Sequence, residues 1–130
     1  MKGHSRLLWN CCWSQINDNI FFTIGRDKQL IIWKCDQNEW TKLGSKMYPN
    51  AITAIDSAAI NHESETILIG LECGQLRRLI FSNETVEDVE TLDAHLSHGS
   101  TVNQIRFKNK DMVATCADDN QVKLFSICTS

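Results

Sequence analysis

The stretch Phe21–Trp33, FFTIGRDKQLIIW, carries β-branched and aromatic residues on both sides of a short polar turn. This pattern predicts two antiparallel strands joined by a tight turn. The stretch Met112–Phe125, MVATCADDNQVKLF, has the same arrangement. In both stretches a threonine precedes an aspartate by four positions, and an aromatic residue follows that aspartate by six. The agreement indicates an internal repeat, which decides the fold class.

A further copy lies halfway between these two stretches. Asp27 and Asp119 are 92 positions apart, which places a middle turn 46 positions after Asp27, at Cys73-Gly74. The apolar runs Thr66–Gly70 and Gln75–Phe81 flank that turn. A period of 46 residues is close to the roughly 40–45 residues of a four-stranded propeller blade.

The remaining apolar segments predict further strands. We expect innermost strands in segments 8–13, 52–56 and 102–107, and outermost strands in segments 39–43 and 85–91. The last copy has no segment for a fourth strand, so eleven strands are expected. The predicted fold is an all-β propeller with three consecutive four-stranded blades, at residues 1–46, 47–93 and 94–130, the last lacking its outer strand.

Four residues of the first copy could form a chain of hydrogen bonds, namely His4, Thr23, Asp27 and Trp33. The aspartate would accept from the histidine ring, the hydroxyl would bind that ring, and the indole N–H would bind the hydroxyl. Their spacing resembles the structural tetrad of WD40 propellers. The third copy has a partial tetrad, His98, Thr115 and Asp119, because Phe125 has no N–H to donate. The middle blade is expected to be degenerate and held by apolar packing.

The same residue types also occur in nucleophilic triads, which raises a hydrolase as an alternative. A nucleophile requires an exposed turn and oxyanion donors, and the chain has no G-x-S-x-G elbow. It also has no phosphate-binding glycine loop and no CxxC pair among its six cysteines. We therefore predict no enzyme activity, no catalytic or metal-binding residues, no cofactor and no small-molecule substrate.

Beyond the repeat, the runs His4–Ser14, HSRLLWNCCWS, and Ile69–Leu76, IGLECGQL, are similar to the family of second subunits of the Elongator complex. The order of the three blades resembles the carboxyl end of that family. The resemblance implies a non-catalytic scaffold that binds other protein subunits and supports wobble-uridine modification of transfer RNA. Since propellers use about four to eight blades, three cannot close a ring, and we expect the chain to be part of something larger.

Two other functions remain open at this point. One is a WD40 adaptor of another multiprotein complex, because the tetrad identifies only the fold. The other is a surface that binds transfer RNA directly, which the net charge of −3 disfavours. In either case, partner contacts are expected in turns on one rim, at Arg26, Lys28, Glu72, Asp118 and Asn120.

Composition places the chain among folded globular proteins, with 42% hydrophobic and 22% charged residues. No apolar run approaches the roughly 18 residues of a membrane helix, so no membrane contact is expected. Nothing resembles a secretory signal peptide after Met1, and the cysteines are interpreted as free thiols of a reducing compartment. The expected location is the cytoplasm, with the nucleus left open as a second one.

Overall fold

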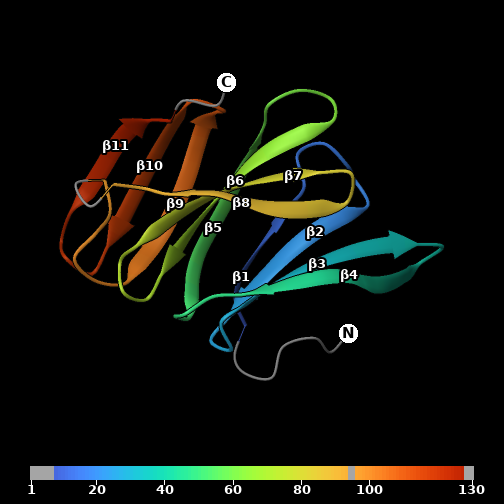
Figure 1. Cartoon of the computed structure of the whole chain (residues 1–130), viewed down its shortest axis with the longest axis horizontal. Coiled ribbons are helices and arrows are strands. Elements are labelled where there is room, and N and C mark those ends of the chain that lie inside the picture. Colours follow the sequence, from blue (N-terminus) through green and yellow to red (C-terminus); the bar gives the residue numbers. More distant parts are fainter. Residues whose placement is uncertain (1–7, 94–95, 128–130) are drawn as a thin grey trace.

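The computed structural model describes residues 8–93 and 96–127, and these residues form eleven strands and no helix (Figure 1). The strands are β1 (Leu8–Trp13), β2 (Ile20–Gly25), β3 (Gln29–Asp36), β4 (Glu39–Met47), β5 (Ile52–Ala59), β6 (Ser64–Leu71), β7 (Leu76–Ser82), β8 (Thr85–Thr91), β9 (Val102–Asn109), β10 (Met112–Ala117) and β11 (Val122–Ser126). Within these ranges there is no helix long and apolar enough to span a membrane.

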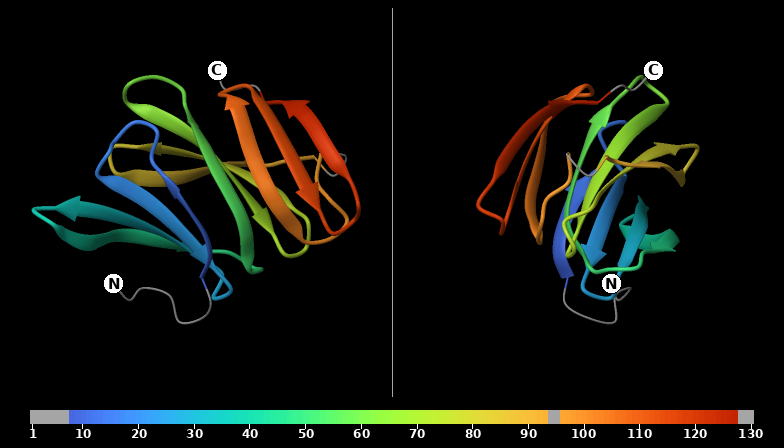
Figure 2. Two further views of the ribbon diagram at one scale, coloured as in Figure 1. Left: turned by 180° about the vertical axis from the view of Figure 1, so that it is seen from behind. Right: turned by 60° about the vertical axis from the view of Figure 1, so that its left-hand side comes forward.

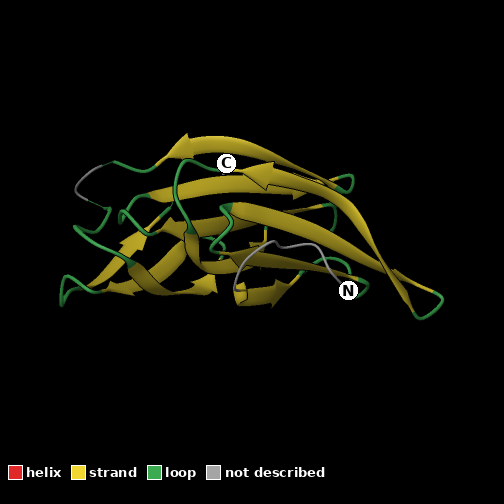
Figure 3. Ribbon diagram, turned by 90° about the horizontal axis from the view of Figure 1, so that it is seen from below, coloured by secondary structure: helices red, strands yellow, loops and turns green. Residues whose placement is uncertain are grey.

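The strands form three antiparallel sheets, in which each strand pairs with the next along the chain. The first sheet contains β1–β4, the second contains β5–β8, and the third contains β9–β11. The second sheet lies between the other two, and its first strand β5 contacts both β1 and β9 (Figures 1 and 2). Seen from below, the described part of the chain consists of strands and connecting loops (Figure 3). The all-β, unclosed architecture expected from the sequence is confirmed for this part of the chain.

The hydrophobic core consists of two clusters, one on each face of the second sheet. On one face, Ile67 and Ile69 of β6 pack with the first sheet, where Phe22 meets Phe81 edge-on at 5.2 Å between ring centroids. On the other face, Leu68 packs with Val102 and other residues of the third sheet. Because both of its faces are covered, β6 is buried almost continuously from Glu65 to Leu71. Its residues Ile67–Leu71 are accordingly apolar or glycine without alternation, unlike those of a strand with a solvent-facing side.

The second and third sheets approach closely at Gly70. A Cβ placed on Gly70 would lie 2.6 Å from the Cβ of Val102. The hydroxyl of Thr53 donates to the carbonyl oxygen of Gly70 at 3.2 Å. Packing therefore requires glycine at this position, because only a residue without a side chain lets the backbone of β6 lie against the β-branched side chain of Val102.

Buried polar contacts also connect the sheets. The Glu65 carboxylate, at 0% exposure, accepts from the Ser14 hydroxyl and from the Gln15 N–H, the latter at 3.1 Å. Desolvation raises the pKa of Glu65, and these hydrogen bonds oppose that rise. On the other side, Asp56 accepts from the N–H of Phe107 at 2.7 Å. Each link fixes the position of one sheet relative to the next.

The turns repeat at a fixed interval. Positive φ angles occur at Lys28 (68°), Gly74 (94°) and Asn120 (64°), in the turn after the second strand of each sheet. Successive members of this set are 46 positions apart. The tight turns after β3 and β7 are also 46 positions apart, at Gln37-Asn38 and Asn83-Glu84. Both residues of each turn have positive φ angles, as a two-residue type I′ hairpin turn requires.

The fourth strand is longer than the expected segment 39–43. β3 continues to pair with it up to Met47, which lies opposite Gln29. A register shift between Ile32 and Trp33 interrupts the alternation of side chains, next to Gly44. The apolar pattern in the sequence therefore ends before the strand does.

The close approach at Gly70 gives a testable prediction. Gly70→Ala forces Val102 and the third sheet away, so the free energy of unfolding should fall by about 1–3 kcal/mol, as for other overpacked cores. Gly44→Ala is the matched control, because it also replaces a strand glycine but its Cβ would have no atom within 4 Å. Denaturant unfolding of both variants measures the difference. Equal stability of the two variants would contradict the packing described here.

Candidate functional site

The most connected polar group of the third sheet is centred on His98. Its ring Nδ1 lies 3.0 and 3.1 Å from the two carboxylate oxygens of Asp119, and its Nε2 lies 2.7 Å from the hydroxyl of Thr115. Thr115 belongs to β10, Asp119 to the turn after β10, and His98 to the segment before β9. With the proton on Nδ1, the ring donates to Asp119 and accepts from the Thr115 hydroxyl.

The Asp119 carboxylate has further donors, one in its own turn and one in the segment that carries His98. It accepts from the backbone N–H groups of Gly99 and Gln121, both at 3.0 Å. Desolvation opposes ionisation, but these two N–H groups and His98 outweigh it, so the pKa of Asp119 lies below its ordinary value. The carboxylate therefore remains charged and holds the turn against the segment that carries His98.

The middle turn packs against this same segment. The N–H of His98 donates to the carbonyl oxygen of Gly74 at 2.9 Å. A Cβ on Gly74 would overlap the carbonyl group of His98, and its φ of 94° is also unfavourable for other residues. The histidine network of the third sheet is thus held in part by the second sheet.

In the first sheet the structure brings two of the proposed tetrad residues together. The indole N–H of Trp33 donates to the hydroxyl of Thr23 at 2.8 Å in a buried position. Asp27 lies in the following turn, where it accepts from the N–H of Gln29 at 3.3 Å. His4 lies outside the described residues. In the second sheet the corresponding positions are Ile69 and Leu79, both fully buried, and Cys73, which is exposed.

The geometry of the histidine network favours a structural role over a catalytic one. The His98 side chain has 0% exposure, and Thr115 is 2% exposed. Both ring nitrogens are already within hydrogen-bond distance of partners. A threonine nucleophile must reach a substrate carbonyl and oxyanion donors, and this hydroxyl is enclosed between strands. We find no group of three or more potential metal ligands within the described part of the chain.

The five candidate contact residues all lie in turns that follow the second strand of a sheet. Arg26 and Lys28 follow β2, Glu72 follows β6, and Asp118 and Asn120 follow β10. All five are exposed. Asp118 also accepts from the side-chain amide of Asn103 at 2.7 Å. These turns form an accessible set of polar groups, although their contacts with a partner remain a prediction.

Two features of the site could not be inferred from residue patterns. The contact between Gly74 and His98 joins different repeats. The sequence indicated only that Gly74 lies in a turn and did not indicate its contact with His98. The Glu65 link was also missed, because a carboxylate near the start of a strand is normally interpreted as solvent-exposed. Both features depend on how sheets pack, which periodicity within one repeat does not describe.

Known proteins provide an independent comparison over most of the chain. A relative from Schizosaccharomyces pombe is 31% identical over 83% of the chain. The chain is similar to Elongator complex protein 2. The proteins of that name from Homo sapiens and Drosophila melanogaster are 26% and 25% identical over 95% of the chain. At that coverage, the similarity to Elongator complex protein 2 extends over all three sheets.

The chain spans only a small part of these relatives. It covers 15% of the Schizosaccharomyces pombe protein, 19% of the human protein and 17% of the Drosophila melanogaster protein. No family model matches the chain. The likeness to the Elongator family indicated by His4–Ser14 and Ile69–Leu76 is thus supported by curated relatives called Elongator complex protein 2.

The histidine network predicts a specific stability effect. Thr115→Val keeps the side-chain shape but leaves Nε2 of His98 without its buried partner, so unfolding should become easier by about 1–3 kcal/mol. Thr91→Val, at an exposed position on β8, is the control and should change stability by no more than about 0.5 kcal/mol. Thermal and denaturant unfolding can test both. A Thr115→Val variant as stable as the control would show that the network contributes nothing.

Proposed function

We propose that this chain supplies three consecutive blades of a WD40-type β-propeller, in residues 1–46, 47–93 and 94–130. In this proposal His4, Thr23, Asp27 and Trp33 form the tetrad of the first blade, and His98, Thr115 and Asp119 form a partial one in the third. The hydrogen bonds of Trp33 and of His98 support it. The middle blade relies on apolar packing of residues such as Ile69 and Leu79.

The proposed role is that of a non-catalytic scaffold in an Elongator-like complex. The observation that carries the proposal is the similarity to Elongator complex protein 2 across all three sheets. The scaffold would hold other subunits in place and so support wobble-uridine modification of transfer RNA, while a different subunit performs the chemistry. We place it in the cytoplasm, with the nucleus as a second location.

Exposed apolar residues support participation in a larger assembly. Val122 and Leu124 on β11 are 78% and 70% exposed, and Trp13 on β1 is 56% exposed. These residues belong to the two sheets that flank the second sheet. Large apolar side chains that reach solvent on a sheet are favourable contacts for a further sheet or a partner. The exposed turns at Arg26, Lys28, Glu72, Asp118 and Asn120 would supply polar contacts on one rim.

The proposal predicts a particular set of partners in cells. The affinity-tagged chain, expressed in cells that contain Elongator, should copurify the catalytic subunit of that complex, as detected by mass spectrometry. A Leu68→Asp variant is the control, because a charge at this fully buried position disrupts the core and should abolish recovery. Reproducible recovery of a ubiquitin-ligase or chromatin complex without Elongator subunits would instead identify a WD40 adaptor of another assembly.

A further inference from the structure

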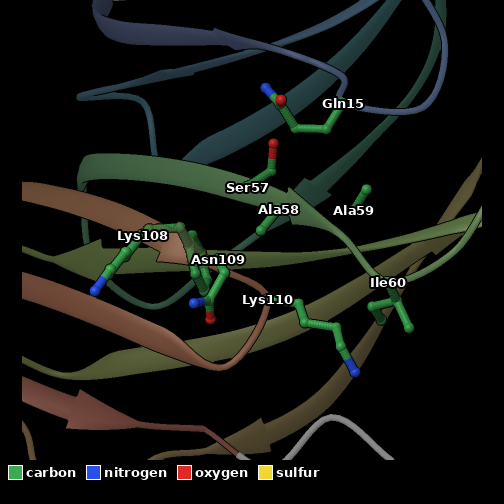
Figure 4. A pocket seen from close by; sticks show the side chains of 9 residues that line it. Gln15, Ser57, Ala58, Ala59, Ile60, Lys108, Asn109 and Lys110 are labelled. Atoms are coloured by element: carbon green, nitrogen blue, oxygen red, sulfur yellow. The ribbon is translucent and has the colours of Figure 1, made fainter.

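A pocket of about 480 Å³ opens between the carboxyl ends of β5 and β9, beside the segment that follows β1 (Figure 4). Ser57 of the second sheet, Lys108 of the third sheet and Gln15 of the segment after β1 line it. In Figure 4 the Ser57 side chain points toward Gln15 on one side of the pocket, and the β9 residues lie on the other. The volume falls within the range of about 300–1,000 Å³ found for ligand-binding sites.

The charge of this pocket is opposite to that of the chain as a whole. Lys108 and Lys110 line it, both are exposed, and its lining includes no carboxylate among the described residues. Two acids adjoin the lining. The Asp111 carboxylate lies 3.9 Å from Lys110 Nζ, and the Asp56 carboxylate accepts from the N–H of Phe107 at 2.7 Å. Arg106 lies two positions before Lys108 on β9, outside the residues that line the pocket. A local cationic site thus occurs in a chain with a net charge of −3.

The two lysines do not converge on one point. In Figure 4 their side chains extend in different directions on either side of Asn109. A single small anion would therefore contact one ammonium group at a time. Carboxylates at alternate positions of an extended segment lie about 6.5–7 Å apart along the strand, which allows neighbouring acidic side chains to reach different lysines.

Part of the pocket lining, called its floor below, is apolar and consists of Ala58, Ala59, Ile60 and Phe107. Ala58 is 9% exposed, while Ile60 and Phe107 are partly buried. The exposed side-chain amides of Gln15 and Asn109 lie around these residues and could bind backbone groups of a peptide. The Ser57 hydroxyl is 5% exposed and already donates to the Trp13 carbonyl oxygen at 3.4 Å. Small apolar side chains between the acidic residues would fit such a floor, in agreement with the mixed lining of most binding sites.

We propose that this pocket, called the β5–β9 pocket, binds an extended acidic segment of a partner protein, with acidic and small apolar residues alternating. A peptide agrees with the observations better than a nucleic acid, because phosphate recognition uses a basic surface that extends along the backbone. The proposal deepens the scaffold function and rests on it for the source of the segment. Binding by the purified chain is measured independently of which complex is recovered from cells.

The test is fluorescence anisotropy with the purified chain and a short fluorescein-labelled peptide in which glutamate and alanine alternate. The double variant Lys108→Gln, Lys110→Gln should bind at least about fivefold more weakly, since each exposed ion pair contributes a modest amount. Binding should also weaken as salt rises, because salt screens exposed charges. A peptide with glutamine in place of glutamate should not bind.

Lys42→Glu is the matched control, because it lowers the net charge by two, as the double variant does, at an exposed position on β4. It should bind the acidic peptide like the parent chain. The charge-reversed variant Lys108→Glu, Lys110→Glu should bind a peptide in which lysine and alanine alternate. Circular dichroism establishes that each variant remains folded.

Three results would overturn the proposal. One is no binding of the acidic peptide by the parent chain. Another is equal weakening by Lys42→Glu and by the double variant, which would show an effect of net charge alone. The third is binding of a labelled single-stranded RNA that depends on Lys108 and Lys110 while the peptide does not bind, which would identify a nucleic-acid surface instead.

Discussion

Burial of β6, the second strand of the second sheet, on both faces is the constraint on which the rest of the structure depends. β6 has no solvent-facing side, so its residues must complement the first sheet and the third sheet at once. Gly70 allows the close approach to Val102, and Gly74 allows the contact with His98. A change in the second sheet would therefore be transmitted to both neighbours, because close-packed interiors tolerate little displacement.

Polar contacts determine how the sheets are placed once apolar burial has brought them together. Glu65 joins the second sheet to the segment after β1, and Asp56 joins it to β9. The Tyr48 hydroxyl donates to Asp88 at 2.9 Å, while the Arg77 guanidinium lies 5.4 Å from the Tyr48 ring centroid. Burial and the neighbouring carboxylate raise the pKa of Tyr48, which keeps its proton on the hydroxyl. Such directional contacts give a scaffold a defined shape, which apolar packing alone specifies less well.

Much of this fold could be predicted from the sequence because repetition is visible in residue patterns. The match between Phe21–Trp33 and Met112–Phe125 located corresponding strands, and the spacing placed the middle turn at Cys73-Gly74. The likeness to the Elongator family also followed from short motifs. The ends of strands were harder to predict. β4 shows this, because its pairing with β3 continues after the apolar pattern has ended.

Contacts between repeats could not be predicted in the same way. The position of Glu65 depends on the Ser14 hydroxyl that the first sheet brings to it. The β5–β9 pocket depends on two strand ends that are far apart in the sequence. Lys108 and Lys110 are ordinary surface residues until the packing of the sheets places them at a pocket. The sequence patterns therefore predicted the repeated unit. The candidate binding surface arises from the packing of one sheet against the next, which those patterns do not describe.

Amide hydrogen exchange, resolved by residue, tests most directly the claim that the second sheet is the centre of the structure. Exchange through unfolding is slowest where burial and hydrogen bonding are most complete. The account predicts that amides of β6 and β7 exchange more slowly than those of β4 and β11, whose side chains are largely exposed. Exchange from β6 as fast as from β4 and β11 would contradict it.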